Sequence, residues 1–403
     1  MRRFIIVGNG AAGIAAAQSI VRADPAAEVH IFGAESYPYY RRPRLWELIA
    51  GQIKQYELFF RPLEWYAARG IQVHLGAQVT ALDSAKHRLT LANGNSVQYD
   101  RLLLATGARP FKPPFAGADK DGVFTLRTLE DALAIKRYAR DISTSVIIGG
   151  GLLGLETARA LSTAGLEVTV LEFAPHLLPL QLDAEGAEVL QSLLEAQGLH
   201  ILTGADTEAI SGDECATGVQ LGDGRVVEGE LVLVSTGIRS RVELGRQVGL
   251  EVKHGIVVDE QLRTSATDIY AAGDAAEYDG RVYGIIPAAI EQAQIAAANM
   301  TASGSAAYSG TVPATTLKIA GVDLTCLGQA TAAGDEFVIL RNANPASGLY
   351  RRITLRGGKI VGAILLGDTR DVRALKQLIA TGKDVSAHSE FLLDKCFDLR
   401  ALS

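Results

Sequence analysis

The chain has 403 residues, a formal net charge of -6, 48% hydrophobic residues and only 6% aromatic residues. This length predicts two or three domains, each large enough to bury a core. The acidic balance and the lack of a basic stripe with interleaved aromatics argue against nucleic acid binding. No apolar run is long enough to span a bilayer, and the sequence begins with a core strand rather than a signal peptide. We therefore expect a cytoplasmic protein without a membrane partner.

The first pattern is an apolar strand, residues 3–7, that runs into a glycine-rich turn and an alanine-rich helix. Gly8 suits the tight turn, Gly10 lets a ligand approach the backbone, and Gly13 lets the helix lie against the strand. The start of the helix directs free backbone N–H groups and the positive end of its dipole at the turn. The stretch therefore predicts a binding site for the pyrophosphate of a dinucleotide.

A second predicted strand, residues 28–32, is followed by Glu35. A carboxylate at this strand end can accept hydrogen bonds from both ribose hydroxyls of an adenosine. The stretch from Arg41 to Arg44 then places three arginines among aromatics and prolines. Because forked arginine donors can clamp a diphosphate, we expect this loop, with Arg42, to lie over the same site.

The same pattern recurs in the middle of the chain. An apolar strand, residues 146–148, leads to Gly149, Gly151 and Gly154 at the start of a helix, and the next strand ends at Glu172. This is a second dinucleotide fold. An acidic residue at that strand end accepts the 2′-hydroxyl of a ribose and repels a 2′-phosphate, and no arginine follows it. We therefore expect NADH to be preferred over NADPH.

Two further features occur once in each of the two dinucleotide-binding regions, namely a hairpin dipeptide and a strand that reaches a Thr-Gly pair. The dipeptides Asn93-Gly94 and Asp223-Gly224 predict β-hairpins. The apolar runs at residues 101–110 and 230–239 each predict a strand that reaches a Thr-Gly pair, where the chain comes close to whatever lies at the strand end.

The last third of the chain adds a carboxylate, a helix and a further domain. A short strand in the stretch of residues 267–274 ends in Gly-Asp, where Asp274 can accept hydrogen bonds from polyol hydroxyls. A helix over residues 287–299, with proline in its first turn, can favour negative charge at its N-terminus. A small α+β domain is predicted from four strands and a helix, at residues 316–320, 337–340, 350–355, 359–366 and 372–379.

Taken together, these motifs resemble the FAD- and NAD(P)H-dependent pyridine nucleotide-disulfide oxidoreductase superfamily over essentially the whole chain. The resemblance implies an α/β fold with two Rossmann-like dinucleotide-binding domains of the glutathione-reductase type and a small α+β C-terminal domain. It implies a discontinuous FAD-binding domain at residues 1–112 and 240–307, an NADH-binding domain at 113–239 and the C-terminal domain at 308–403. FAD and NADH are the implied cofactors.

The same resemblance implies which residues hold the cofactors. Those implied for FAD are Gly8, Gly10, Ala11, Ala12, Gly13, Glu35, Arg42, Val79, Ala105, Thr106, Gly107, Arg127, Gly273, Asp274 and Ile286. Those implied for NADH are Gly149, Gly151, Leu152, Leu153, Gly154, Glu172 and Gly237. Two catalytic residues are implied as well, Glu156 to orient the nicotinamide and Lys318 to stabilise negative charge on the reduced flavin.

The branch of the superfamily depends on cysteine. Glutathione-reductase-like members carry a redox disulfide soon after the first dinucleotide unit, and NADH oxidase and peroxidase-like members carry one cysteine there, but no cysteine precedes Cys215 here. Electrons therefore leave the flavin without a protein thiol. Residues 40–45 and 350–368 are most similar to NADH:rubredoxin reductases and to the flavin module of NADH-dependent nitrite reductases. Glu47 stands where ferredoxin reductases of oxygenase systems usually carry a lysine, which argues against that subgroup.

We therefore predict an NADH:rubredoxin oxidoreductase that passes single electrons to rubredoxin or a similar small electron carrier. Residues 308–403 hold more Lys and Arg than Asp and Glu, which suits an acidic partner. The alternatives are a reductase component of a nitrite, nitric oxide or ferredoxin system, an NADH oxidase or peroxidase, and a flavoprotein that signals through NADH-linked changes of shape. No metal site is predicted, and both a monomer and a homodimer fit the sequence.

Overall fold

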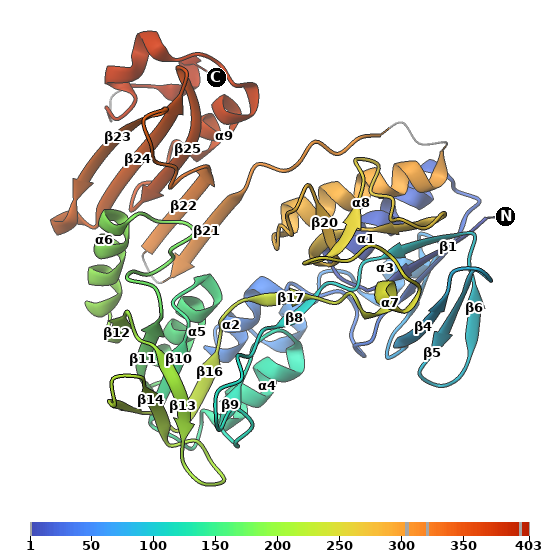
Figure 1. Cartoon of the computed structure of the whole chain (residues 1–403), viewed down its shortest axis with the longest axis horizontal. Helices are drawn as coiled ribbons and strands as arrows, with labels where there is room; N and C mark the ends of the chain where they lie inside the picture. The colour runs from blue at the N-terminus through green and yellow to red at the C-terminus, as the bar shows by residue number, and fades with distance from the viewer. Residues whose placement is uncertain (1, 303–305, 320–321, 395–396, 403) are drawn as a thin grey trace. The chain divides into compact units, whose positions relative to one another are not determined.

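The computed structural model describes residues 2–302, 306–319, 322–394 and 397–402. Contacts divide the chain into two compact units (Figure 1). The first unit holds residues 1–43, 54–111 and 238–311, and the second holds residues 44–53, 112–237 and 312–403. The boundaries of the three domains expected from the sequence stay predictions.

A five-stranded parallel sheet forms the centre of the first unit, with the order β19-β7-β1-β2-β3. Its central strand is nearly all buried, because helices cover a parallel sheet on both faces. Two alanine-rich helices, α1 (Ala11–Ala23) and α8 (Ile286–Thr301), pack closely against each other. The strands are β1 (Arg3–Val7), β2 (Glu28–Phe32), β3 (Ile71–His74), β7 (Arg101–Leu104) and β19 (Ile269–Ala271).

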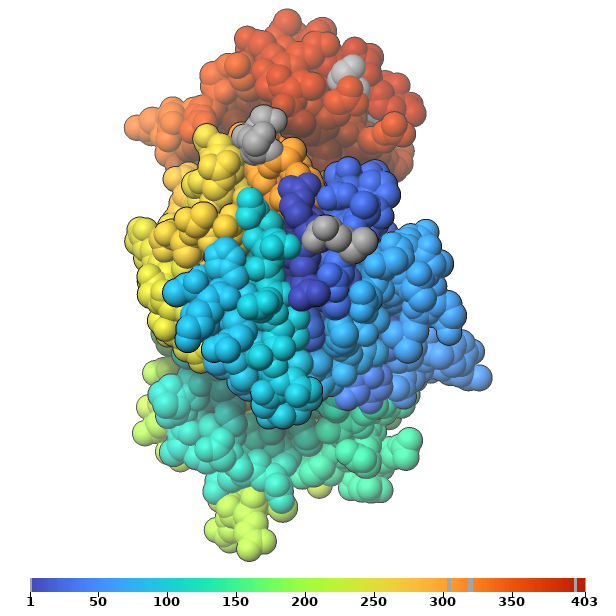
Figure 2. Space-filling model, turned by 90° about the vertical axis from the view of Figure 1, so that its right-hand side faces the viewer, coloured from blue at the N-terminus to red at the C-terminus, as the bar shows by residue number. Residues whose placement is uncertain are grey.

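Smaller elements complete the first unit. The predicted hairpin at Asn93-Gly94 is confirmed, since Gly94 has a φ of +85° between β5 and β6. Together with β4 these strands form an antiparallel sheet, drawn in light blue in Figure 2. Their bounds are β4 (Val79–Asp83), β5 (Arg88–Leu91) and β6 (Ser96–Gln98). The unit also contains α3 (Leu63–Ala67), α7 (Glu243–Gln247), β18 (Ile256–Val258), the 3₁₀ turn η3 (Gly273–Ala275) and β20 (Ala276–Tyr278).

The second unit repeats this plan with a parallel sheet of order β12-β11-β10-β16-β9. Its strands are β9 (Val123–Phe124), β10 (Thr144–Ile148), β11 (Glu167–Glu172), β12 (Leu199–Thr203) and β16 (Leu231–Val234). Its helices in this region are α2 (Leu45–Ile49), α4 (Leu129–Tyr138), α5 (Leu152–Thr163) and α6 (Ala184–Glu195). The predicted turn at Asp223-Gly224 joins β14 (Gly218–Leu221) to β15 (Val226–Glu228), and β13 (Thr207–Ser211) completes that small sheet.

The two Thr-Gly strands continue in a way that the sequence did not predict. Gly107 and Gly237 have φ values of +70° and +105°, a left-handed backbone that ends each parallel strand. The chain resumes in two short strands, β8 (Ala108–Pro110) and β17 (Ile238–Ser240), which pair antiparallel with each other. The two runs are therefore each a parallel strand, a turn and a short antiparallel strand.

The C-terminal part of the second unit is an antiparallel sheet of order β21-β22-β25-β24-β23, covered by α9 (Val372–Thr381). Its strands are β21 (Ala314–Ile319), β22 (Val322–Gly328), β23 (Phe337–Asn344), β24 (Leu349–Arg356) and β25 (Lys359–Leu366). The sequence prediction of an α+β domain is confirmed, but it missed β22, and residue 320 of the first predicted strand lies outside the described residues.

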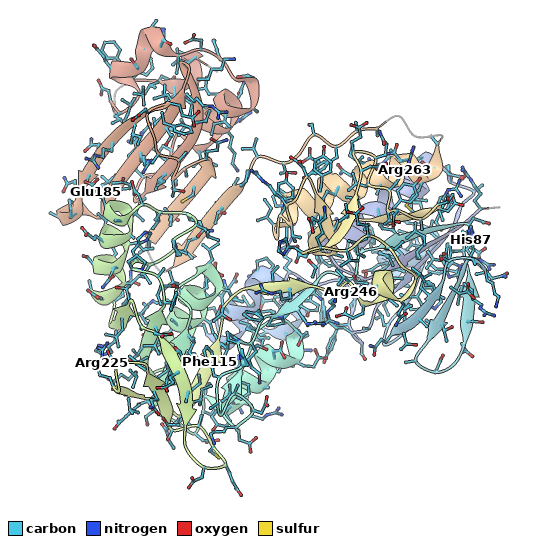
Figure 3. The ribbon with its side chains drawn as sticks, in the orientation of Figure 1. His87, Phe115, Glu185, Arg225, Arg246 and Arg263 are labelled. Atoms are coloured by element: carbon cyan, nitrogen blue, oxygen red, sulfur yellow. The ribbon has the colours of Figure 1, made fainter. Side chains whose placement is uncertain are left out.

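Ion pairs and hydrogen bonds attach this sheet to α6. Asp183, at the start of that helix, accepts hydrogen bonds from the Tyr350 hydroxyl and from Arg352, both at 2.6 Å. Arg341 forms an ion pair of 3.1 Å with Glu185, which Figure 3 labels in the first turn of α6 beside the sheet. Because Arg352 is only 5% exposed, the contact with Asp183 is part of the core.

Candidate cofactor-binding sites

The glycine turn of the first unit is built for close approach of backbone to backbone. Gly8 has a φ of +121°, and its N–H donates to the Phe32 carbonyl at 2.8 Å. A Cβ at Gly8 would overlap the carbonyl oxygen of Ala105, and one at Gly13 would overlap that of Gly8. Gly10 begins α1 without any side-chain cap, so the N–H groups of the first helical turn stay available to an anion.

Glu35 and Arg42 lie together, which the sequence did not predict. The Glu35 carboxylate accepts a hydrogen bond from the Tyr40 hydroxyl at 2.5 Å and forms an ion pair with Arg42. Burial alone would lower the pKa of Arg42, but Tyr40 and Glu35 outweigh it and hold that pKa above its usual value. A Cβ at Gly10 would lie 3.5 Å from Arg42 Nη1, so this guanidinium borders the glycine turn.

Two buried donors near this turn lack a partner among the described residues. They are Arg42 Nε and Asn9 Nδ2. An unpaired buried donor is costly, and a bound group rich in acceptor oxygens removes that cost. The residues present therefore fit the adenosine diphosphate half of FAD.

Apart from Arg127, the other residues expected at FAD lie on segments of the first unit. At the end of β7, the Ala105 N–H donates to the Val7 carbonyl at 2.9 Å, and the Thr106 hydroxyl donates to the Arg241 carbonyl at 2.7 Å. Gly107 follows directly with its positive φ. Val79 is buried at the start of β4.

A further segment of this unit is the 3₁₀ turn η3, which packs against α8. Gly273 has a φ of +74°, and a Cβ there would lie 3.2 Å from the Cβ of Ala12 in α1. Its N–H donates to Gln292 Oε1 at 2.8 Å, and Gln292 is 1% exposed. The sequence did not predict this role of Gln292, although a glutamine among the alanines of the helix was a visible signal. Asp274 is partly buried in the same turn, and Ile286 is the first residue of α8.

The second unit has a glycine turn of the same construction. Gly149 has a φ of +114°, and a Cβ there would overlap the Ser235 carbonyl oxygen, while one at Gly154 would overlap that of Gly149. Gly151 begins α5 without a side-chain cap, and a Cβ there would meet no atom within 4 Å. Leu152 and Leu153 are the first helical residues.

The carboxylate of Glu172 holds this turn in place. One oxygen accepts the Gly150 N–H and the other accepts the Ala174 N–H, each at 2.7 Å. Each oxygen keeps a lone pair with which it can accept a ribose hydroxyl. Gly237 has open space where a Cβ would lie, at the carboxyl end of the same sheet.

Glu156 lies in α5, which packs against α2. Burial, and to a smaller extent the charge of Glu47 in α2, raise the pKa of Glu156 to about 8. Glu47 itself is bound by Arg44 at distances of 2.5 to 3.0 Å. Glu47 therefore takes part in an ion pair, and Glu156 is largely protonated at neutral pH.

Two predicted residues belong to the second unit but stand apart from its glycine turn in sequence. Arg127 precedes α4, and its backbone N–H donates to Asp131 at 2.9 Å. Lys318 lies in β21, but its side chain is outside the described part of the structure. The cofactor and catalytic roles of all these residues stay predictions. Among the described residues, no helix combines the length and the apolar character that a membrane crossing needs.

Comparisons with known proteins agree with this architecture. Residues 2–298 match the pyridine nucleotide-disulphide oxidoreductase family, and residues 313–383 match the rubredoxin NAD⁺ reductase C-terminal domain. A nitrite reductase [NAD(P)H] of Bacillus subtilis is 35% identical over 96% of this chain and 48% of its own length. An NADH-rubredoxin oxidoreductase of Clostridium acetobutylicum is 29% identical over 94% of this chain and 95% of its own.

The structure is also similar to a ferredoxin reductase for the CYP199A2 system of Rhodopseudomonas palustris. The TM-score is 0.91 at 27% identity, and each chain is covered to 100%. This chain spans about half the length of several curated relatives that it matches. The expected fold is confirmed, and the expected cofactors FAD and NADH are those of the matched family. The chain belongs to the pyridine nucleotide-disulphide oxidoreductase family.

Proposed function

We propose that the chain is an NADH:rubredoxin oxidoreductase, which takes a hydride from NADH onto FAD and passes electrons singly to rubredoxin. The observation that carries this proposal is the pair of glycine turns, at Gly8 and Gly149, each followed by a helix without a side-chain cap. One chain thus offers two dinucleotide sites. Bound FAD supplies the conversion between a two-electron donor and a one-electron acceptor.

In the first unit, the N–H groups at the start of α1 bind the pyrophosphate, and Arg42 adds a positive charge beside them. Asp274 accepts hydrogen bonds from the hydroxyls of the ribityl chain. The N-terminus of α8 favours negative charge near it, because its first-turn N–H groups have no acidic side chain among them. These residues hold and orient the cofactor, and none is a nucleophile.

In the second unit, the open space at Gly151 admits the pyrophosphate of NADH, and Glu172 accepts its ribose hydroxyls. The 2′-phosphate of NADPH would meet the same carboxylate, so NADH is preferred. Glu156, one turn into α5, orients the nicotinamide as a group that is mostly protonated at pH 7. Lys318 stabilises negative charge on the reduced flavin.

The choice of acceptor is supported by the missing cysteine and by the C-terminal sheet. No cysteine precedes Cys215, so no cysteine lies soon after the first dinucleotide unit, where relatives with a redox disulfide carry theirs. The C-terminal sheet matches the rubredoxin NAD⁺ reductase type, and the full-length relative from Clostridium acetobutylicum carries a rubredoxin name. A second candidate is the electron-donating part of a nitrite reductase, because the Bacillus subtilis relative is about twice as long and more similar in sequence.

The test is NADH-driven electron transfer by the purified FAD-loaded chain to rubredoxin, ferredoxin, a sirohaem protein, oxygen and hydrogen peroxide. We expect rubredoxin to be reduced at least about tenfold faster than the others, and more slowly at high salt, because charge steers the encounter of carrier and reductase. Faster reduction of the sirohaem protein would favour the second candidate. Fast turnover with oxygen or peroxide alone would overturn both.

A further inference from the structure

The residue between the first two glycines of the opening turn is an asparagine whose side chain is held by a distant tyrosine. Tyr66, in α3, is fully buried, and its hydroxyl donates to Asn9 Oδ1 at 3.1 Å. The same hydroxyl oxygen accepts the backbone N–H of Tyr39 at 3.1 Å. Asn9 is thus joined to a segment 57 residues away, within the same unit.

These two hydrogen bonds fix the orientation of the Asn9 amide. A tyrosine hydroxyl has one proton to donate. Because the Tyr66 oxygen already accepts the Tyr39 N–H, the hydroxyl proton is donated to an acceptor on Asn9. Burial raises the pKa of Tyr66, which keeps the hydroxyl protonated. The oxygen of the amide therefore faces Tyr66, and its NH₂ group faces away.

The Asn9 NH₂ group is then a buried donor with no acceptor among the described residues. The neighbouring residues indicate which ligand this NH₂ group would bind. A Cβ at Gly33 would lie 3.1 Å from Asn9 Cβ, so this side chain lies against the end of β2, just before Glu35. The second unpaired donor, Arg42 Nε, belongs to the guanidinium that borders Gly10. Both donors therefore belong to side chains at the glycine turn, of which Asn9 lies against the end of β2 and Arg42 pairs with Glu35.

We propose that Asn9 is an FAD-binding residue, whose Nδ2 donates a hydrogen bond to an oxygen of the adenosine diphosphate half, and that Tyr66 is the positioning residue that aims it. The inference rests on FAD being the cofactor of the first unit. It goes beyond the glycines and charged residues named above, because it assigns binding to the side chain of the turn residue between Gly8 and Gly10. The proposed hydrogen bond does not involve the flavin ring of FAD, so ADP alone contains the oxygens that Asn9 would bind.

The experiment titrates the cofactor-free protein with FAD, followed by flavin fluorescence, and separately with ADP, followed by calorimetry. Asn9→Asp keeps the acceptor for Tyr66 and the size of the side chain, but it replaces the donor with a negative charge. We expect it to weaken both ligands on the order of a hundredfold, and Asn9→Ala to weaken them on the order of tenfold. Tyr66→Phe, which leaves the amide free to turn, should weaken both about fivefold.

Asn93→Asp is the matched control, because Asn93 Oδ1 also accepts a backbone N–H but lies in the exposed β5–β6 turn. It should bind FAD and ADP as the wild type does. If Asn9→Asp, folded with an unchanged urea midpoint, binds both ligands within twofold of the wild type, Asn9 is only a structural acceptor and the proposal is wrong. Tyr66→Phe covers the case in which Asn9→Asp fails to fold.

Different results would contradict the proposed function and the role of Asn9. A wild-type protein that binds ADP but not FAD would contradict the proposed function, whereas loss of ADP binding in Asn9→Asp would still support the role of Asn9. Tight FAD binding by every variant would leave the proposed function intact and overturn this inference.

Discussion

If Glu156 lies at the nicotinamide as proposed, the affinity of the wild type for NAD⁺ should depend on pH near pH 8, and replacing Glu156 by glutamine should abolish this dependence. The nicotinamide ring of NAD⁺ carries a positive charge, whereas that of NADH is neutral. Burial and then the charge of Glu47 raise the pKa of Glu156 to about 8, so the group gains its negative charge as the pH rises through this value. Ionised Glu156 should therefore tighten the binding of NAD⁺ and leave NADH nearly unchanged.

The size of the effect follows from the pKa. One pH unit below a pKa of about 8 the carboxyl is about nine-tenths protonated, and one unit above it is about nine-tenths ionised. Two unit charges about 4 Å apart near a protein surface attract by about 4 kcal/mol. If a third of this is realised in the partly hydrated site, the ionised form binds NAD⁺ about tenfold more tightly than the protonated form. With these fractions, NAD⁺ should bind about fivefold more tightly at pH 9 than at pH 7.

Calorimetric titration with NAD⁺ and NADH between pH 6.5 and 9.5 measures this directly. Glu47→Gln should move the transition of the wild type to lower pH, because the repelling charge is gone. Glu195→Gln, an exposed carboxylate in α6, is the control and should change neither ligand. A fivefold pH effect that persists in Glu156→Gln, or a wild type whose NAD⁺ affinity falls above pH 8, would refute the reasoning.

The raised pKa also predicts a stability signature. The folded chain keeps the Glu156 proton up to about pH 8, whereas the unfolded chain loses it near the ordinary value of 4.5. The resulting stabilisation is complete below pH 4.5 and is lost by the time the pH has risen through about 8. Between these two pKa values it falls by up to about 1.4 kcal/mol per pH unit. Urea unfolding of Glu156→Gln should show a flatter dependence on pH in this window than the wild type.

Four further substitutions test other parts of the structure. Gly149→Ala should lower the free energy of unfolding by at least about 2 kcal/mol, because it strains the backbone and overlaps a carbonyl oxygen. Gly151→Ala should keep the wild-type urea midpoint but weaken NADH binding about tenfold, because its Cβ enters the space left for the pyrophosphate. Glu172→Ala should weaken NADH more than NADPH, and an unchanged ratio of their dissociation constants would restrict this residue to holding the turn. Asp183→Ala should lower the free energy of unfolding by about 3 to 5 kcal/mol, because it leaves Arg352 buried without its carboxylate, and a loss below about 1 kcal/mol in chemical denaturation would contradict this.

The sequence was most informative where a local rule leaves only one residue type possible. Gly8 and Gly149 could be placed because a strand, a positive φ and a helix in succession require glycine. The hairpin turns at Asn93-Gly94 and Asp223-Gly224 follow the same logic, since their type of turn needs a left-handed residue. Such constraints act over a few residues and are readable in a single sequence.

Contacts between distant segments could not be read in this way. No local sequence pattern shows that Glu35 forms an ion pair with Arg42. Nor does one show that the Tyr350 hydroxyl donates to Asp183, 167 residues away in the sequence. The short strands β8 and β17 form only because two turns bring them together, and neither has enough alternation to predict a strand alone. Tertiary pairing decides these features, and propensity and periodicity do not encode it.

The double use of Glu172 bears on any attempt to re-engineer coenzyme preference. Its two oxygens accept the N–H groups of Gly150 and Ala174, so removal of the carboxylate releases two backbone donors along with the electrostatic barrier to a phosphate. A redesign for NADPH that installs arginine nearby but leaves those donors unsatisfied should lose affinity for both coenzymes. Glutamine at this position, with one amide oxygen kept as an acceptor, is the milder starting point for such a redesign.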